Sequence, residues 1–184
     1  MEILITGCER SGTKMLSEKL GQELNVEFNL ENKHTIGAFK YNLELKRWYK
    51  YLKEEVPLQY VTKFEKHTLT SEINIEFLEW VKYIFPNIKI YYIIRDGRNV
   101  VGSIINREWG HTQTLPVYER SLEDACVQWN TVIDTTWVWA QENCEIIRYE
   151  DVCDRVPRTL DNNENAIITA ALGKNLIKTQ YYIV

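Results

Sequence analysis

The segment Gly7–Lys14 combines residue types that could bind an anion. It reads Gly-Cys-Glu-Arg-Ser-Gly-Thr-Lys and directly follows a short apolar run. The two glycines allow the backbone to wrap closely, so that successive N–H groups can converge on a phosphate. Arg10 and Lys14 add positive charge, and the helix expected to begin here adds the positive end of its dipole. Ser11 and Thr13 add hydroxyl donors. We expect a phosphate cradle, and an ordinary strand–helix turn with surface charges is the alternative.

The order of residues in this segment differs from the Walker A motif of ATP-binding proteins. That motif places a lysine directly after its second glycine, followed by a hydroxyl residue that binds Mg²⁺. Here Thr13 follows Gly12, and Lys14 comes one residue later. A cation also stands earlier in the turn, at Arg10. The order therefore argues against magnesium–ATP chemistry. None of the three histidines of the chain is paired at metal-ligand spacing, so we expect no metal site.

A second candidate anion site follows the strongest strand signal of the chain. Ile90–Ser103 reads IYYIIRDGRNVVGS, in which an apolar strand ends at an arginine and a helix follows. Ligands of open parallel sheets bind at the carboxyl ends of the strands. Arg95 can pair with a phosphate through two hydrogen bonds, and Ser103 can donate a third from the helix. The sequence thus predicts two phosphate-binding positions.

Both motifs resemble those of the sulfotransferases. The donor in that family is 3′-phosphoadenosine 5′-phosphosulfate (PAPS), and the nucleotide product is adenosine 3′,5′-bisphosphate (PAP). Glu9–Lys14 (ERSGTK) is similar to the family's 5′-phosphosulfate loop, and Arg95–Ser103 (RDGRNVVGS) is similar to its 3′-phosphate motif. The Trp129 helix followed by Arg148–Asp151 (RYED) resembles an element of the bacterial members, and Phe85-Pro86 before the central strand is another common feature.

The resemblance is incomplete at three points. Gly97 stands where the family usually has proline, and Lys14 replaces a frequent threonine. Many members also carry a basic element near the C-terminus that contacts the 3′-phosphate, and this chain has no clear copy of it. Three basic residues could replace that element: Arg155, Arg158 and Lys174.

The resemblance implies in-line transfer of a sulfuryl group from PAPS to a hydroxyl or amine of an acceptor, without a metal. The residues implied to bind the donor are Arg10, Ser11, Gly12, Thr13, Lys14, Met15, Arg95 and Ser103. Arg10 is also implied as a catalytic charge clamp, because a guanidinium group does not give up its proton.

The general base that takes the acceptor proton stays open among three residues. His67 and Glu65 are expected near the end of the third strand, where relatives carry a catalytic histidine, and Glu31 follows the second strand. A histidine in a solvent-facing loop is the alternative for His67. Two other activities also remain possible: a P-loop nucleotide or small-molecule kinase, and a non-catalytic homologue that binds adenosine bisphosphate.

Alternating strands and helices must position these residues. The predicted strands are Met1–Thr6, Asn25–Leu30, Gln59–Phe64, Ile88–Ile94 and Cys144–Arg148. The predicted helices are Ser11–Leu24, Phe39–Lys53, Ile73–Phe85, Asn99–Arg107, Leu122–Gln141 and Asn165–Lys178. The alternation predicts an α/β fold of the P-loop NTPase-like kind, a doubly wound and mainly parallel sheet of about five strands flanked by helices. We expect residues 1–184 to form a single sulfotransferase-like domain.

Composition narrows the classes of partner. The 184 residues are 45% hydrophobic and carry a net charge of −4, which gives no global field for nucleic acid or an anionic membrane. We expect no signal peptide and no membrane span. The four cysteines form no CxxC pair, which is typical of reduced thiols. A cytoplasmic protein with a small-molecule or carbohydrate acceptor is the expectation.

Overall fold

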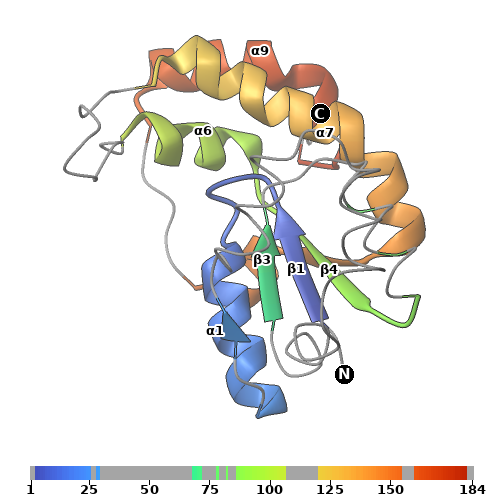
Figure 1. Cartoon of the computed structure of the whole chain (residues 1–184). Coiled ribbons are helices and arrows are strands. Elements are labelled where there is room, and N and C mark those ends of the chain that lie inside the picture. Colours follow the sequence, from blue (N-terminus) through green and yellow to red (C-terminus); the bar gives the residue numbers. More distant parts are fainter. Residues whose placement is uncertain are drawn as a thin grey trace, which may run out of the picture.

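The computed structural model describes residues 3–25, 28–29, 68–71, 78, 82, 86–106, 120–154 and 160–181. The described chain contains both strands and helices (Figure 1), as the sequence predicts. In chain order the elements are β1 (Ile3–Gly7), α1 (Thr13–Leu24), β2 (Phe28–Asn29), β3 (Thr68–Ser71), β4 (Lys89–Ile94), α6 (Gly97–Ile105), α7 (Leu122–Asn143), β5 (Glu145–Arg148), α8 (Tyr149–Val152) and α9 (Asn162–Lys178).

The strands form one five-stranded sheet in the order β2-β3-β1-β4-β5. Each of the four neighbouring pairs is parallel. β1 lies in the middle of the sheet, and all of its residues are buried. An apolar strand that is covered on both faces needs helices above and below it. The expected fold, a parallel α/β sheet of about five strands flanked by helices, is therefore confirmed.

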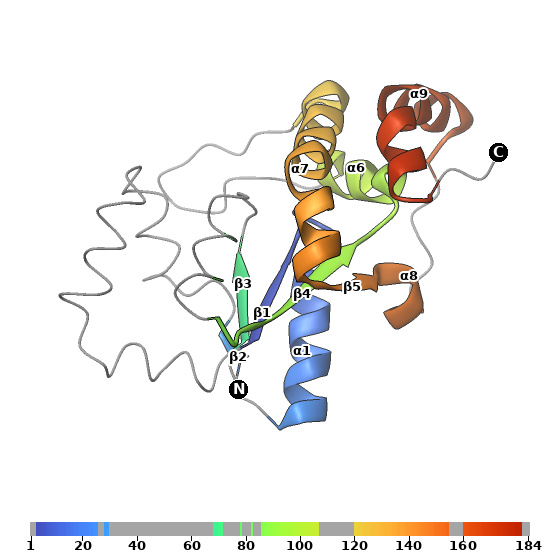
Figure 2. The same ribbon diagram turned by 90° about the vertical axis from the view of Figure 1, so that its right-hand side faces the viewer.

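The side chains of β4 alternate between two hydrophobic clusters. Tyr92 and Ile94 pack with α6, α7 and α9, and the Tyr92 ring meets Trp137 of α7 edge-on at 6.0 Å between centroids. Tyr91 and Ile93 point to the opposite face and pack with α1. Figures 1 and 2 show α7 and α9 side by side, with α6 beside them and α1 apart from them. The alternation places helices on both faces of the sheet, which makes it doubly wound.

Two helices begin earlier than their apolar patterns predict. α6 begins at Gly97 instead of Asn99, because the side chain of Asp96 accepts a hydrogen bond from the amide of Arg98. α9 begins at Asn162 instead of Asn165, because Asp161 and Glu164 form a capping box. Acidic caps of this kind satisfy amides that have no partner inside the helix, and they extend it beyond its apolar face.

The strand next to β1 on one side differs from the prediction. β3 spans Thr68–Ser71, whereas the apolar pattern favours Gln59–Phe64, which lies outside the described residues. Thr68–Ser71 contains one apolar residue, so its hydrophobicity does not mark a buried strand, although threonine is a good strand former. The carboxyl end of β3 is Ser71, and the candidate bases Glu65 and His67 lie outside the described residues.

Three further sequence expectations concern two helices, a membrane span and the cysteines. The predicted helix Phe39–Lys53 lies outside the described residues, and Leu78 and Lys82 of the predicted helix Ile73–Phe85 are helical. In the part of the chain that the structure describes, no helix is long and apolar enough to cross a membrane. All four cysteines are free thiols.

Candidate functional site

The two candidate anion-binding segments meet where the direction of the chain changes across the sheet. β1 leads through α1 toward β2 on one side, and β4 leads through α6 and α7 toward β5 on the other. β1 and β4 are neighbours, with Gly7 paired to Ile93, so their carboxyl ends lie together. Such a switch point is where open α/β sheets place their ligands.

Both glycines of the first segment permit close approach of the backbone. A Cβ atom on Gly7 would lie 2.3 Å from the carbonyl oxygen of Ile93. This distance is too short for any side chain, so the position requires glycine. Gly12 has a positive φ of 99°, and a Cβ atom there would lie 2.5 Å from the ring of Tyr149. The expectation of a tightly wrapped turn is confirmed.

The first turn of α1 differs from the starts of the longer helices described. Gly12 occupies the N-cap position and offers no side chain to the amides, and the first turn holds no acidic residue. The starts of α6, α7 and α9 are capped by Asp96, Ser121 and Asp161. A helix start without an acidic cap is suited to an external anion, because its N–H groups and dipole both favour negative charge.

Three predicted site residues join across the switch point. The Nε atom of Arg10 donates to the Oγ atom of Ser103 at 3.1 Å. The carbonyl oxygen of Arg10 accepts a hydrogen bond from Nη1 of Arg95, also at 3.1 Å. Arg10 reaches this position through a left-handed backbone conformation, with φ at 68°. The turn after β1 and the motif after β4 therefore belong to one cluster.

Two polar groups in this cluster lack partners among the described residues. They are the Oγ atom of Ser11, whose residue is 1% exposed, and the Nε atom of Arg95. The guanidinium group of Arg95 lies over the ring of Tyr149, with Cζ 4.3 Å from its centroid. A buried polar group without a hydrogen bond costs about 1–3 kcal/mol, which a ligand oxygen would remove. The residues present fit two anionic groups, one at the start of α1 and one at Arg95.

Lys14 and Met15 contribute no side chain to this cluster. The ammonium group of Lys14 lies 3.9 Å from Glu18, one turn along α1, and the side chain is 71% exposed. Met15 packs against the hydrophobic cluster between α1 and the sheet. Their backbone amides belong to the first turn of α1.

One contact of the turn has no signal in the sequence. Oε2 of Glu9 accepts hydrogen bonds from Nη1 of Arg120 and from Nε2 of Gln128, each at 3.1 Å. Since Arg120 is 111 residues away along the chain, no local pattern could reveal the pair. The contact joins the turn to the start of α7.

The remaining predicted residues divide into two groups. The candidate bases Glu31, Glu65 and His67 lie outside the described residues, as do Arg155 and Arg158. Lys174, the third candidate for a basic element, is 86% exposed and lies 4.0 Å from Asp134 on the surface shared by α7 and α9. It is not brought to the cluster.

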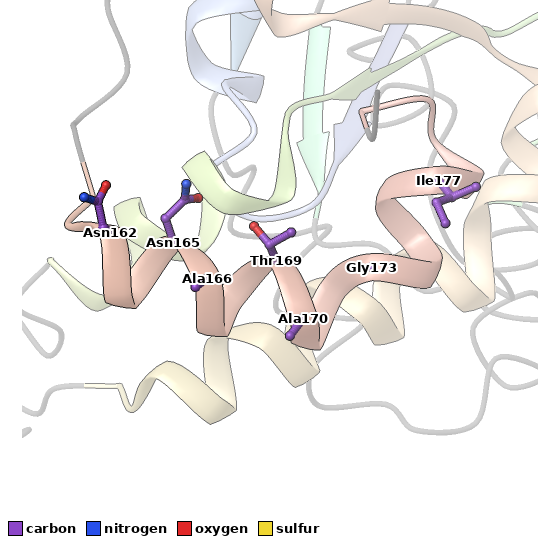
Figure 3. Close-up of a pocket in the computed structure, with 7 residues that line it drawn as sticks. All are labelled: Asn162, Asn165, Ala166, Thr169, Ala170, Gly173 and Ile177. Carbon is purple, nitrogen blue, oxygen red and sulfur yellow. The ribbon is translucent and has the colours of Figure 1, made fainter. Parts of the chain in front are cut away.

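A shallow groove of about 520 Å³ runs along α9 (Figure 3). All of the residues that line it come from that helix, and none of them is ionisable: Asn162, Asn165, Ala166, Thr169, Ala170, Gly173 and Ile177. The groove therefore contains none of the candidate site residues.

Comparisons with known proteins bear on the fold. No protein-family model matches the chain, and no curated protein matches its sequence. A shikimate kinase from Bacteroides thetaiotaomicron is similar in structure, with 12% identity, a TM-score of 0.52 and 97% of both chains covered. Mouse sulfotransferase SULT7A1, solved in complex with PAP, is similar with 17% identity and a TM-score of 0.50. That match covers 96% of this chain and 62% of the mouse chain, so this chain spans less than two thirds of that sulfotransferase. The chain shares the P-loop-like α/β fold of kinases and sulfotransferases.

Proposed function

We propose that this chain is a sulfotransferase that binds PAPS at the cluster of Arg10, Arg95 and Ser103. The observation that supports the proposal is that two sets of groups suited to anions meet in one cluster. One is the start of α1, which has no side-chain cap, and the other is Arg95, whose buried Nε atom has no partner among the described residues. PAPS carries phosphate on both the 3′ and the 5′ oxygen, and this pair of positions suits such a nucleotide.

The residues divide between the two ends of the nucleotide. The amides of Gly12, Thr13, Lys14 and Met15, with the Ser11 hydroxyl, would hold the 5′-phosphosulfate. Arg95 and Ser103 would hold the 3′-phosphate. Arg10 belongs to the turn before α1, and its contacts with Ser103 and Arg95 join that turn to the second position.

The chemistry is an in-line displacement at sulfur. The acceptor oxygen or nitrogen forms a bond to sulfur while the bond from sulfur to the 5′-phosphate oxygen breaks. That oxygen keeps the electron pair and leaves as part of PAP, and the acceptor proton passes to a general base. Arg10 and the first-turn amides of α1 would stabilise the charge that grows on the leaving oxygen. Glu31, Glu65 and His67 remain the predicted candidates for the base.

A phosphoryl transfer is the second candidate function. The structural likeness to a shikimate kinase, which covers 97% of both chains, favours it. The loop lysine argues against it, because Lys14 comes one residue later than in a Walker A motif and lies beside Glu18. A homologue that binds PAP without turnover is a third possibility.

Thermal unfolding with three nucleotides separates these functions. At a hundredfold excess over Kd, a ligand stabilises the folded state by about 2.7 kcal/mol, which raises Tm by roughly 5–10 °C in a chain of this size. We expect this shift with PAP in EDTA and a smaller one with adenosine 5′-monophosphate. A shift with ATP and Mg²⁺ but not with PAP would contradict the proposal. Stabilisation by PAP, with no labelled sulfate moved from PAPS to any acceptor in a broad panel, would identify the non-catalytic homologue.

A further inference from the structure

Both peptide groups that flank Arg95 are held by the same pair of side chains. The hydroxyl of Tyr181 donates a hydrogen bond shared between Oε2 of Glu150, at 2.7 Å, and the carbonyl oxygen of Ile94, at 3.3 Å. The other carboxylate oxygen of Glu150 accepts from the amide of Asp96 at 3.2 Å. Ile94 precedes Arg95 and Asp96 follows it, so the two contacts fix the backbone on either side of the arginine.

The side chain of Arg95 is held by the residue next to Glu150. Its guanidinium group lies over the ring of Tyr149, 4.3 Å from the centroid. That ring also fills the space beside Gly12, where a Cβ atom would meet it at 2.5 Å. The short helix α8 thus supports Arg95 through two consecutive residues, one against the side chain and one against the backbone.

Tyr181 is itself held by contacts of its backbone and its ring. Its amide donates to the carbonyl oxygen of Leu176 at 2.8 Å, and its own carbonyl oxygen accepts from Nη2 of Arg98 at 3.3 Å. Arg148 lies over its ring, 4.7 Å from the centroid, and donates to the carbonyl oxygen of Thr179 at 2.9 Å. Burial and the carboxylate of Glu150 both raise the pKa of Tyr181, so the hydroxyl keeps the proton that it donates.

We propose that Tyr181 and Glu150 are positioning residues that aim Arg95 at the second phosphate of the nucleotide. They act through the peptide groups of Ile94 and Asp96 and need no contact with the ligand. The inference rests on the proposed function, because it assumes that Arg95 binds a 3′-phosphate. It predicts that the segment following α9 controls how well the protein distinguishes PAP from adenosine 5′-monophosphate, which lacks that phosphate.

The test compares the affinities of these two nucleotides by titration calorimetry. Tyr181→Phe removes one hydroxyl, and we expect it to weaken PAP binding by about five- to tenfold while leaving the affinity for adenosine 5′-monophosphate unchanged. Glu150→Ala is expected to act in the same way, and its exposed position makes it tolerable to the fold. Glu150→Gln should restore part of the preference, because an amide oxygen can still accept a hydrogen bond.

Tyr92→Phe is the matched control. It also removes a tyrosine hydroxyl, but that group bonds Thr136 of α7 at 2.8 Å, within the core. We expect Tyr92→Phe to lower Tm and to leave the ratio of the two affinities unchanged. The inference is overturned if Tyr181→Phe and Glu150→Ala keep the wild-type ratio, or if they weaken both nucleotides equally. A wild-type protein without preference for PAP would instead overturn the proposed function, and with it the role of Arg95.

Discussion

At the residue scale, Arg10 has an unfavourable backbone conformation that its hydrogen bonds hold in place. A left-handed backbone costs a non-glycine residue about 1–2 kcal/mol. Arg10 adopts it with φ at 68°, and the same conformation allows its side chain to reach Ser103 and its carbonyl oxygen to reach Arg95. Strain of this kind persists where neighbouring contacts hold it, and such positions cluster at ligand sites.

Two substitutions at Arg10 separate this strain from the charge. Arg10→Gly and Arg10→Ala both remove the guanidinium group, but only glycine adopts the left-handed conformation without cost. We expect the glycine variant to be more stable than the alanine variant by about 1 kcal/mol, measured by urea unfolding. Turnover of both variants should fall by about a hundredfold or more, with a smaller loss of PAPS affinity. A loss of affinity larger than the loss of turnover would make Arg10 a ground-state binder.

Arg95→Ala tests the second anion position directly. Removing a charged hydrogen-bond donor should weaken PAP binding by roughly 1.5–3 kcal/mol, measured by calorimetry, while adenosine 5′-monophosphate keeps its affinity. Lys174→Ala is the control, because Lys174 is 86% exposed and lies beside Asp134 on another surface. Unchanged PAP binding in Arg95→Ala would remove the role assigned to Arg95.

At the element scale, the close packing of helices explains why position 97 is a glycine. Glycine stands here where the sulfotransferases that the sequence resembles usually have proline. In the structure Gly97 is the first residue of α6, and a Cβ atom would lie 2.8 Å from both Trp129 and Leu172. The position thus allows α6 to approach α7 and α9 closely.

A pair of glycine-to-alanine substitutions tests this reading. Gly97→Ala should destabilise the fold by about 1–3 kcal/mol, because the added methyl group overpacks the core. Gly173→Ala, within α9, should stabilise it by up to about 1 kcal/mol, because its Cβ would meet nothing within 4 Å and alanine favours the helix. The free energy of unfolding in urea measures both. Equal effects of the two substitutions would contradict the steric account of Gly97.

The sequence predicts the strands and helices whose apolar pattern is strong. β1, β4, α1 and α7 lie within two residues of their predicted bounds, and the pairing of Arg10 with Ser103 agrees with the two predicted motifs. The misses have physical causes. β3 contains a single apolar residue, so no hydrophobic pattern marks it as a strand. The contacts of Glu9 with Arg120 and of Glu150 with Tyr181 depend on the tertiary fold. Such long-range contacts leave no local pattern.

At the scale of the whole molecule, the sheet buries polar titratable groups together with its core. Burial raises the pKa of the thiols of Cys8 and Cys144 to about 12. It also raises the pKa of Tyr92 and Tyr181. All four groups are neutral in the folded state at neutral pH. In the unfolded chain their pKa values would be lower than in the folded state, so they would ionise earlier as the pH rises.

This burial predicts sensitivity to alkali. A raised folded pKa contributes stability that is fully present below the unfolded value and is lost as pH rises toward the folded one. The free energy of unfolding should therefore fall between about pH 9 and pH 12, the window set by Cys8 and Cys144. Urea unfolding at a series of pH values measures it, with thiol labelling of Cys8 expected only in urea. A free energy of unfolding that rises over this pH range would contradict the assignment of Cys8 and Cys144 as buried, neutral thiols.

The switch point between β1 and β4 places the start of α1 and Arg95 at one edge of the sheet. A crystal structure of the protein with PAP bound tests the account most directly. We expect the 5′-phosphate on the first-turn amides of α1, and the 3′-phosphate within about 3 Å of Nε of Arg95 and of the Ser103 hydroxyl. A nucleotide bound elsewhere, or a 3′-phosphate without contact to Arg95, would contradict it.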